Sequence, residues 1–190
     1  GTPIPQVTSD AEWSNLATGA WAYYNNDPTK RRLYNWYALA GIHDAASFSD
    51  PSLRKEFAPQ GWQVPSDPEW TILEEYLIAN GYNYDGTMTE NKIAKSMAST
   101  VGWGSIGTNT VGAPAIDQSL NNSSGFNAFP TGAWYGGHFQ DEGRFSTFLT
   151  STEYSNDSYV YTRWIGESDV SLRWQQLQKK CGFQVRFVRD

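Results

Sequence analysis

The chain has 190 residues, enough to bury one sizeable core. Its net charge is −6 and its basic residues are spread out, so the basic stripe of a nucleic-acid-binding protein is absent from the sequence. No apolar run approaches the roughly 20 residues of a membrane-spanning helix. Aromatic residues make up 15% of the chain, and we expect them to supply much of the core.

Short elements are expected in the first forty residues. Residues 1–9 form an extended lead-in, because their two prolines disfavour helix. Asp10–Leu16 has room for one helical turn. The aromatic, alternating run Trp21–Asp27 predicts a strand that ends in a turn. Leu33–Ala40 leaves strand or short helix open, and we favour a strand for most of it.

A helix is indicated directly after Val64. Ser66 and Glu69 have the spacing of a capping box, whereas Asp67–Pro68 fits an N-cap followed by proline, one residue later. Both interpretations place a helix start here. Apolar residues at three- and four-residue steps give the helix a buried face: Trp70, Leu73 and Leu77. Asn80–Gly81 predicts its end.

The second half of the chain predicts one more helix and then strands. Thr89–Ser99 has a capping threonine and a shared apolar face, which favours a helix. Gly102–Gly125 is rich in Gly, Asn, Ser and Thr and is expected to be a long surface loop. Gly136–Gly137 predicts a hairpin turn. Alternating runs predict strands at Phe126–Tyr135, His138–Gln140, Gly143–Thr150, Tyr159–Ile165, Val170–Trp174 and Phe183–Val188. Helices early and antiparallel strands late indicate an α+β domain.

Five sequence blocks carry a resemblance to a known family. They are Leu33–Tyr37 (LYNWY), Gly61–Trp70 (GWQVPSDPEW), Ser124–Pro130 (SGFNAFP), Ser151–Glu153 (STE) and Gly182–Asp190 (GFQVRFVRD). In this order they resemble the Fibrobacter succinogenes major paralogous domain, from about Trp13 to Asp190. The family is similar to a branch of the C-type-lectin-like superfold that includes the formylglycine-generating enzyme and the variable proteins of diversity-generating retroelements.

The resemblance implies one C-type-lectin-like domain over residues 1–190. Its fold would have two helices packed on twisted antiparallel sheets with long loops, and termini close together. Family members often carry a cysteine shortly before the GW pair and another near the end, where this chain has Ala58 or a neighbour and Phe187. A disulfide between those places cannot form here. Strand pairing and aromatic packing must therefore hold this region together.

Catalysis is not expected. The formylglycine-generating relatives use a cysteine pair, whereas this chain has only Cys181, which we interpret as a small core residue. Carboxylates occur together at Asp141–Glu142 and Glu167–Asp169. Acid–base work would require two carboxylates that face one substrate bond. Neighbouring carboxylates on a glycine-flanked turn are more often solvated.

Metal ligands are sparse in the sequence. Glu153, Asn156 and Asp157 offer the oxygen ligands that calcium prefers, so a calcium site is one interpretation of this segment. The alternative is a turn in which Asn and Asp side chains bond their own backbone. The calcium-binding motifs of C-type lectins are absent. His43 and His138 are far apart in the sequence and have no cysteine nearby, which argues against zinc.

The late strands carry the predicted ligand-binding residues. Aromatic and arginine side chains gather there among polar residues: Tyr154, Tyr159, Tyr161, Arg163, Trp164, Arg173 and Trp174. Strand alternation places Tyr159, Tyr161 and Arg163 on one face, which we expect to be outward, with Trp164 inward. A second candidate surface surrounds the Gly136–Gly137 turn and comprises Trp134, Tyr135 and His138.

These observations predict a non-catalytic module that binds a glycan or protein ligand. The resemblance implies an extracellular or cell-surface location in Bacteroidetes or Fibrobacter, with a signal segment or lipid anchor removed from the front of this sequence. No cofactor, nucleic acid or membrane-spanning segment is expected. Two alternatives stay open. One is a structural spacer of a surface assembly with no ligand of its own, and the other is an enzyme that diverged from the formylglycine-generating branch.

Overall fold

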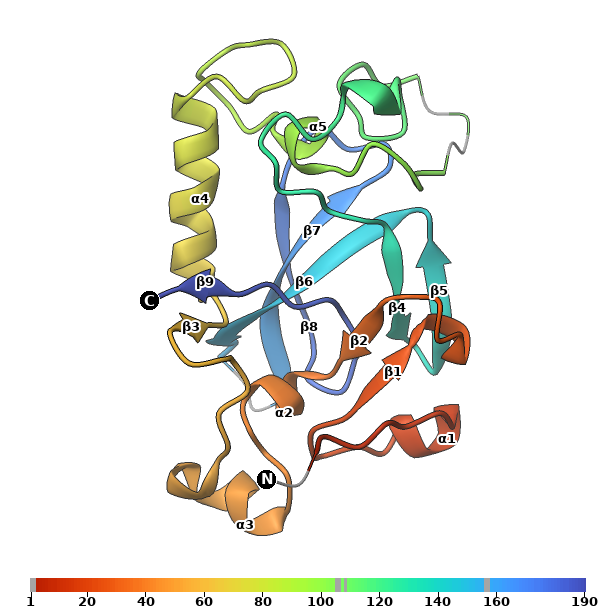
Figure 1. Ribbon diagram of the computed structural model, residues 1–190, viewed down its shortest axis with the longest axis vertical. Helices are drawn as coiled ribbons and strands as arrows, with labels where there is room; N and C mark the ends of the chain where they lie inside the picture. The colour runs from red at the N-terminus through yellow and green to blue at the C-terminus, as the bar shows by residue number, and fades with distance from the viewer. Residues whose placement is uncertain (1–2, 105–106, 108, 156–157) are drawn as a thin grey trace.

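The computed structural model describes residues 3–104, 107, 109–155 and 158–190. It shows an α+β architecture with few helices and small antiparallel sheets (Figure 1). The α-helices are α1 (Asp10–Trp13), α2 (Trp36–Leu39), α3 (Ala45–Ser49), α4 (Asp67–Ala79) and α5 (Ala94–Met97). Three 3-10 turns accompany them, η1 (Tyr24–Asn26), η2 (Pro51–Leu53) and η3 (Gln118–Leu120). Among the described residues, no helix is long and apolar enough to cross a membrane.

Each strand pairs with a strand that is adjacent to it in the sequence, except that the C-terminal β9 pairs with β3. Their bounds are β1 (Trp21–Tyr23), β2 (Arg32–Tyr34), β3 (Trp62–Gln63), β4 (Thr131–Tyr135), β5 (His138–Glu142), β6 (Phe145–Glu153), β7 (Tyr159–Gly166), β8 (Arg173–Gln178) and β9 (Val188–Arg189). The sheets are β1–β2, β3–β9, β4–β5 and β6–β7–β8. The lead-in pairs with β1 through Gln6, and the C-terminal β9 pairs with β3. Among the described residues, the two chain ends therefore pair with different strands rather than with each other.

The sheet β6–β7–β8 separates two clusters of buried side chains. On one face, Phe148 and Ile165 pack with Trp70 of α4. On the other face, Leu149 and Val160 pack with Trp36 of α2. Aromatic side chains fill much of the core, as the composition predicts: Trp13, Tyr24, Trp36, Trp70, Trp103, Trp134, Phe148 and Phe183 are buried.

Helix α4 begins at the predicted corner. Ser66 is its N-cap, and the reciprocal bonds of a capping box join Ser66 and Glu69, with Ser66 N–H donating to Glu69 at 2.7 Å. The interpretation with Asp67 as N-cap is wrong by one residue. Asn80 ends the helix, and Gly81 follows with a φ of 75°.

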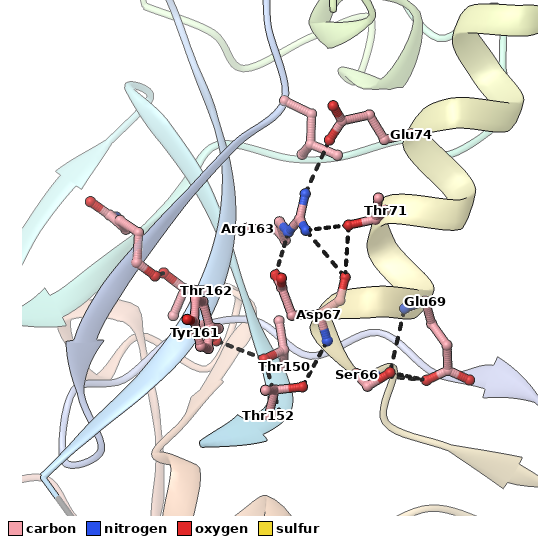
Figure 2. A network of polar contacts seen from close by, with 12 residues as sticks. Ser66, Asp67, Glu69, Thr71, Glu74, Thr150, Thr152, Tyr161, Thr162 and Arg163 are labelled. Atoms are coloured by element: carbon pink, nitrogen blue, oxygen red, sulfur yellow. Dashed lines mark hydrogen bonds and ion pairs between the residues drawn. The ribbon is translucent and has the colours of Figure 1, made fainter. Parts of the chain in front are cut away.

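Arg163 of β7 joins the sheet to the first two turns of α4, as Figure 2 shows. Its Nε donates to Asp67 Oδ1 at 2.6 Å and its Nη1 donates to Glu74 Oε2 at 3.0 Å. Its Nη2 donates to Thr71 Oγ1 and to the main-chain oxygen of Asp67. Thr152 of β6 accepts the main-chain N–H of Asp67 at 2.9 Å. The guanidinium thus bonds side chains and backbone of the helix at once.

Two local predictions are wrong. The helix expected over Thr89–Ser99 is limited to α5, because Glu90 has a φ of 63°, which no helix accommodates. The Asn83 side chain holds that bend, since it bonds the main chain of Thr89, Glu90 and Lys92. Half of Leu33–Ala40 is helical and Leu33 and Tyr34 lie in strand β2, because Asn35 caps α2 with a side chain that accepts from Ala38 N–H at 3.1 Å.

The strand predictions of the second half are met in part. β7 ends one residue beyond its predicted bound, and β4 is limited to the last five residues of its run. β8 shares only Arg173 and Trp174 with its predicted run, and Val188 is the one residue of Phe183–Val188 that lies in a named strand. Gly136 and Gly137, with φ of 65° and 94°, form the hairpin turn between β4 and β5. Within Gly102–Gly125, the described residues hold the single turn η3, in agreement with a loop.

Arg163→Met is expected to lower the free energy of unfolding by about 3 kcal/mol, because it leaves the part-buried carboxylates of Asp67 and Glu74 without their compensating charge. Denaturant unfolding followed by tryptophan fluorescence measures the loss. Arg189→Met, on the exposed end of β9, is the matched control and should change stability by less than about 0.5 kcal/mol. Equal stability of the two variants would show that the Arg163 cluster does not hold α4 to the sheet.

Candidate functional site

A hollow of about 290 Å³ lies between the β4–β5 hairpin and the face of the β6–β7–β8 sheet opposite α4. Both walls contribute side chains, and Phe183 completes the lining. The lining residues are Ala133, Tyr135, Asp141, Phe145, Thr147, Trp164, Gln175, Leu177 and Phe183. Four aromatic rings and several hydrogen-bonding groups therefore meet in one concave site.

Strand register explains why these side chains share a face. Thr147 of β6 lies opposite Trp164 of β7, which lies opposite Arg173 of β8. Alternation adds Gln175 to the same face, two residues beyond Arg173. The Phe145 ring meets the Trp164 indole edge to face, with centroids 5.5 Å apart, and the Arg173 guanidinium lies 6.0 Å from the indole centroid. Trp164 is thereby held between an aromatic ring and a cation.

The hairpin wall depends on a glycine. Gly132 of β4 has a φ of 64°, and a Cβ placed there would lie 2.4 Å from the main-chain oxygen of Gln140. Only glycine combines this backbone geometry with so close an approach of β5. The hairpin can therefore curve over the sheet and present Tyr135 and Asp141 to the hollow.

Polar groups in the hollow are few but distinct. Asp141 accepts from Arg144 at 3.2 Å, and both side chains are partly exposed, so the carboxylate retains acceptor capacity. Thr147 and Gln175 add a hydroxyl and an amide. The indole Nε1 of Trp164 is buried and has no hydrogen-bond partner among the described residues. Among the described residues, the indole Nε1 atoms of Trp36, Trp70 and Trp103 are buried and unpaired in the same way, so this donor does not by itself mark a ligand site.

The expectation that Arg163 points outward to a ligand is wrong. The side chain shares a strand face with Tyr159 and Tyr161, as alternation predicts, but it is only 4% exposed because α4 covers that end of the face. Trp164 lies on the opposite face, as predicted, where it lines the hollow instead of filling the core.

The prediction that Trp134 belongs to an exposed ligand-binding surface is also wrong. Its indole is buried, packs against Trp13 with centroids 5.5 Å apart and donates to Asp10 Oδ1 at 2.6 Å. Its neighbours meet the expectation of exposure, since Tyr135 and His138 both lie exposed beside the hairpin turn. Of the three, Tyr135 lines the hollow.

A second aromatic group lies on the α4 face of the sheet. The Tyr161 ring is 5.2 Å from that of Tyr154 and 5.6 Å from that of Trp174, which is 58% exposed. We call these three rings the aromatic row. Tyr159 is half-buried on the same face. The row and the hollow therefore lie on opposite faces of one sheet.

The described residues do not support the calcium site that the sequence suggested at Glu153, Asn156 and Asp157. Glu153 forms an ion pair with Lys179, so its carboxylate already has a cation. Asn156 and Asp157 lie outside the described residues. Among the residues that the structure describes, no group of three His, Cys, Asp or Glu side chains could hold a metal ion.

The sequence did not indicate several lining residues: Ala133, Phe145, Thr147, Gln175, Leu177 and Phe183. Alternation in β6 and β8 carried the necessary signal, because every second residue of each strand shares the face of Trp164. The missing information was that the β4–β5 hairpin stands over this face. That packing joins segments with no local sequence pattern in common.

Comparison with known proteins places the chain in a family. The family model of the Fibrobacter succinogenes major domain matches residues 1–189, nearly the whole chain. The protein belongs to this family, which confirms the resemblance seen in the sequence blocks. Neither the curated proteins nor the solved structures gave a match.

Cys181 is expected to be inert in the folded protein. It is 1% exposed, and burial raises the pKa of its thiol to about 12, so little thiolate forms in mildly alkaline buffer. Ellman's reagent should therefore react after denaturation but not before. An exposed thiol introduced by Ser119→Cys is the control and should react in the folded state. Rapid native reaction of the parent chain would contradict the burial of Cys181.

Proposed function

We propose that this chain is a non-catalytic recognition module of an extracellular or surface-attached bacterial protein, and that the hollow beside Trp164 binds a glycan. The observation that carries the proposal is the combination of Tyr135, Phe145 and Trp164 with Asp141 and the amide and hydroxyl groups around them. The extracellular location follows the family resemblance of the sequence blocks.

Sugar rings match this lining chemically. The C–H face of a pyranose is apolar enough to stack on Trp or Tyr, while its hydroxyls require directional partners at the ring edge. The Trp164 face and the exposed Tyr135 offer stacking surfaces, and Asp141 and Gln175 offer an acceptor and an amide. The volume is near the lower end of small-molecule sites, roughly 300 Å³, which favours one sugar unit at a chain end.

A C-type-lectin-like fold is part of the proposal. It is supported by the strand-to-helix corner at Ser66–Glu69, by the α+β arrangement and by the pairing of the C-terminal strand β9 with β3. In this fold the late strands and their loops usually carry the ligand site. The proposed hollow uses β4 to β8, which are late strands of this chain.

A protein ligand is the second candidate, and the aromatic row favours it. Tyr and Trp side chains are enriched at the energetically important positions of protein interfaces, and the row combines exposed Trp174 with half-buried Tyr154 and Tyr161. Among the described residues, no hollow like the one beside Trp164 is lined by the row, so it suits a broad partner better than a single sugar. The two candidates use opposite faces and can be separated by mutation.

A glycan array probed with the whole chain, followed by calorimetry on the best binder, tests the glycan site. Tyr135→Ala and Trp164→Ala should each weaken binding about tenfold, equivalent to roughly 1.4 kcal/mol of lost stacking and burial. Tyr135 is exposed, so its variant is expected to fold normally.

Trp174→Ala is the matched control, because it removes an exposed tryptophan from the opposite face of the same sheet. It should leave glycan affinity unchanged. A loss with Trp174→Ala and none with Tyr135→Ala would move recognition to the aromatic row. Absence of glycan binding, together with absence of protein binding, would favour the structural spacer.

A further inference from the structure

A second hollow, of about 330 Å³, lies where β2 meets the segment that follows Phe183. Tyr34 and Phe183 form an antiparallel bridge, with N–H···O bonds of 2.8 and 2.9 Å in the two directions. Residues just before Tyr34 therefore lie beside residues just after Phe183. This register brings together three arginines that are far apart in sequence: Arg31, Arg32 and Arg186 all line the hollow.

Within the part of the chain that the structure describes, the three guanidinium groups have no carboxylate partner. Among the described residues, none of Arg31, Arg32 and Arg186 forms an ion pair, although the chain has a net charge of −6. Burial lowers the pKa of Arg186, and the nearby positive charge of Arg31 lowers it further. Like charges gathered without a counter-charge raise the free energy of the folded chain. An anion in the hollow would offset that cost.

Aromatic rings hold the arginines in place. Arg31 stacks over Phe129 at 4.0 Å, Arg32 over Trp21 at 4.3 Å and Arg186 over Phe126 at 4.8 Å. A stacked guanidinium keeps its N–H groups at the edge of the stack, where the Tyr34 and Tyr23 hydroxyls lie beside Arg32 and an oxyanion can bond the remaining N–H groups. Arg186 uses one nitrogen on the main-chain oxygens of Phe126 and Asn127, which fixes its position further. The cationic side of the hollow is thus pre-organised.

The rest of the lining is aromatic and apolar. Phe57 lies between Tyr34, at a centroid distance of 5.2 Å, and Phe187, at 5.7 Å, and Phe187 is 40% exposed. Together with Val185, these rings give the hollow a wall for a ring-shaped group. A small inorganic ion would leave this wall unused, and so would a peptide made only of Asp and Glu.

From this combination we propose that the hollow of Arg31, Arg32 and Arg186 binds an acidic sugar unit, one that carries a carboxylate or sulfate on its ring. The arginines bond the oxyanion and the Tyr34, Phe57 and Phe187 rings contact the sugar face. The site is separate from the Trp164 hollow and does not depend on it.

Calorimetry of the whole chain with an oligogalacturonate, a sulfated oligosaccharide and a neutral galactan oligomer of equal length tests the proposal. Either acidic oligomer should bind at least tenfold more tightly than the neutral one, and added salt should weaken that binding. Inorganic sulfate and acetate should bind far more weakly than the acidic oligomers. The two acidic probes distinguish a uronate from a sulfate ester.

Arg31→Gln and Arg32→Gln remove exposed charges and should each weaken acidic-oligomer binding at least tenfold. Arg189→Gln, an equal change of charge on exposed β9 outside the lining, should leave binding unchanged. Tyr135→Ala, in the other hollow, should also leave it unchanged, so this result stands apart from the first proposal. The idea is overturned by equal affinity for the neutral oligomer, by tighter binding of poly-glutamate, by an equal loss in Arg189→Gln, or by no binding of either acidic oligomer.

Discussion

The compensated charge of Arg163 is the interaction on which the arrangement of this protein depends. A guanidinium that is 4% exposed is costly unless its N–H groups find oxygens, and here Asp67, Thr71 and Glu74 supply them from successive turns of α4. All three belong to one helix, and the cation belongs to the middle strand of the sheet. The cluster therefore specifies both the position and the rotation of α4, which general apolar contact alone would leave less constrained (Figure 2).

Fixing α4 on one face leaves the other face of β6–β7–β8 available for a site. Residues that alternate with Arg163 must point away from the helix, and Trp164 is the first of them. The β4–β5 hairpin then stands over this face, brought close by Gly132, and the remaining gap becomes the hollow. The buried ion pair and the proposed site are consequences of the same strand geometry, one residue apart.

Local sequence signals were sufficient to predict conformation where it depends on contacts between residues close together in the sequence. Ser66 and Glu69 specify the start of α4, and Gly136–Gly137 specify the hairpin turn, because each rests on contacts within a few residues. Alternation placed Arg163 and Trp164 on opposite faces, but it carries no information on which face a helix will cover. The burial of Trp134 depends on Asp10, 124 positions away, and the bend at Glu90 depends on Asn83. No periodicity encodes such distant partners, so these residues could not be placed from sequence.

Two other buried cations of this protein, Lys95 and Lys179, also have oxygen partners for their charged groups. The Lys95 ammonium, 8% exposed, donates to Asn121 Oδ1 at 2.9 Å and to main-chain oxygens of Ile116 and Asp117. Lys179, 5% exposed, pairs with Glu153 and lies 4.3 Å from the centre of the Trp36 ring.

Arg163 is compensated by two carboxylates, those of Asp67 and Glu74. Arg31, Arg32 and Arg186 differ from Arg163 and Lys179, because they have aromatic faces but no carboxylate among the described residues. The Phe187 ring packs on Phe57, with centroids 5.7 Å apart. The residues that hold this region together without a disulfide are thus the residues that line a cationic hollow. An external oxyanion would supply these arginines with the counter-charge that Arg163 and Lys179 find within the chain.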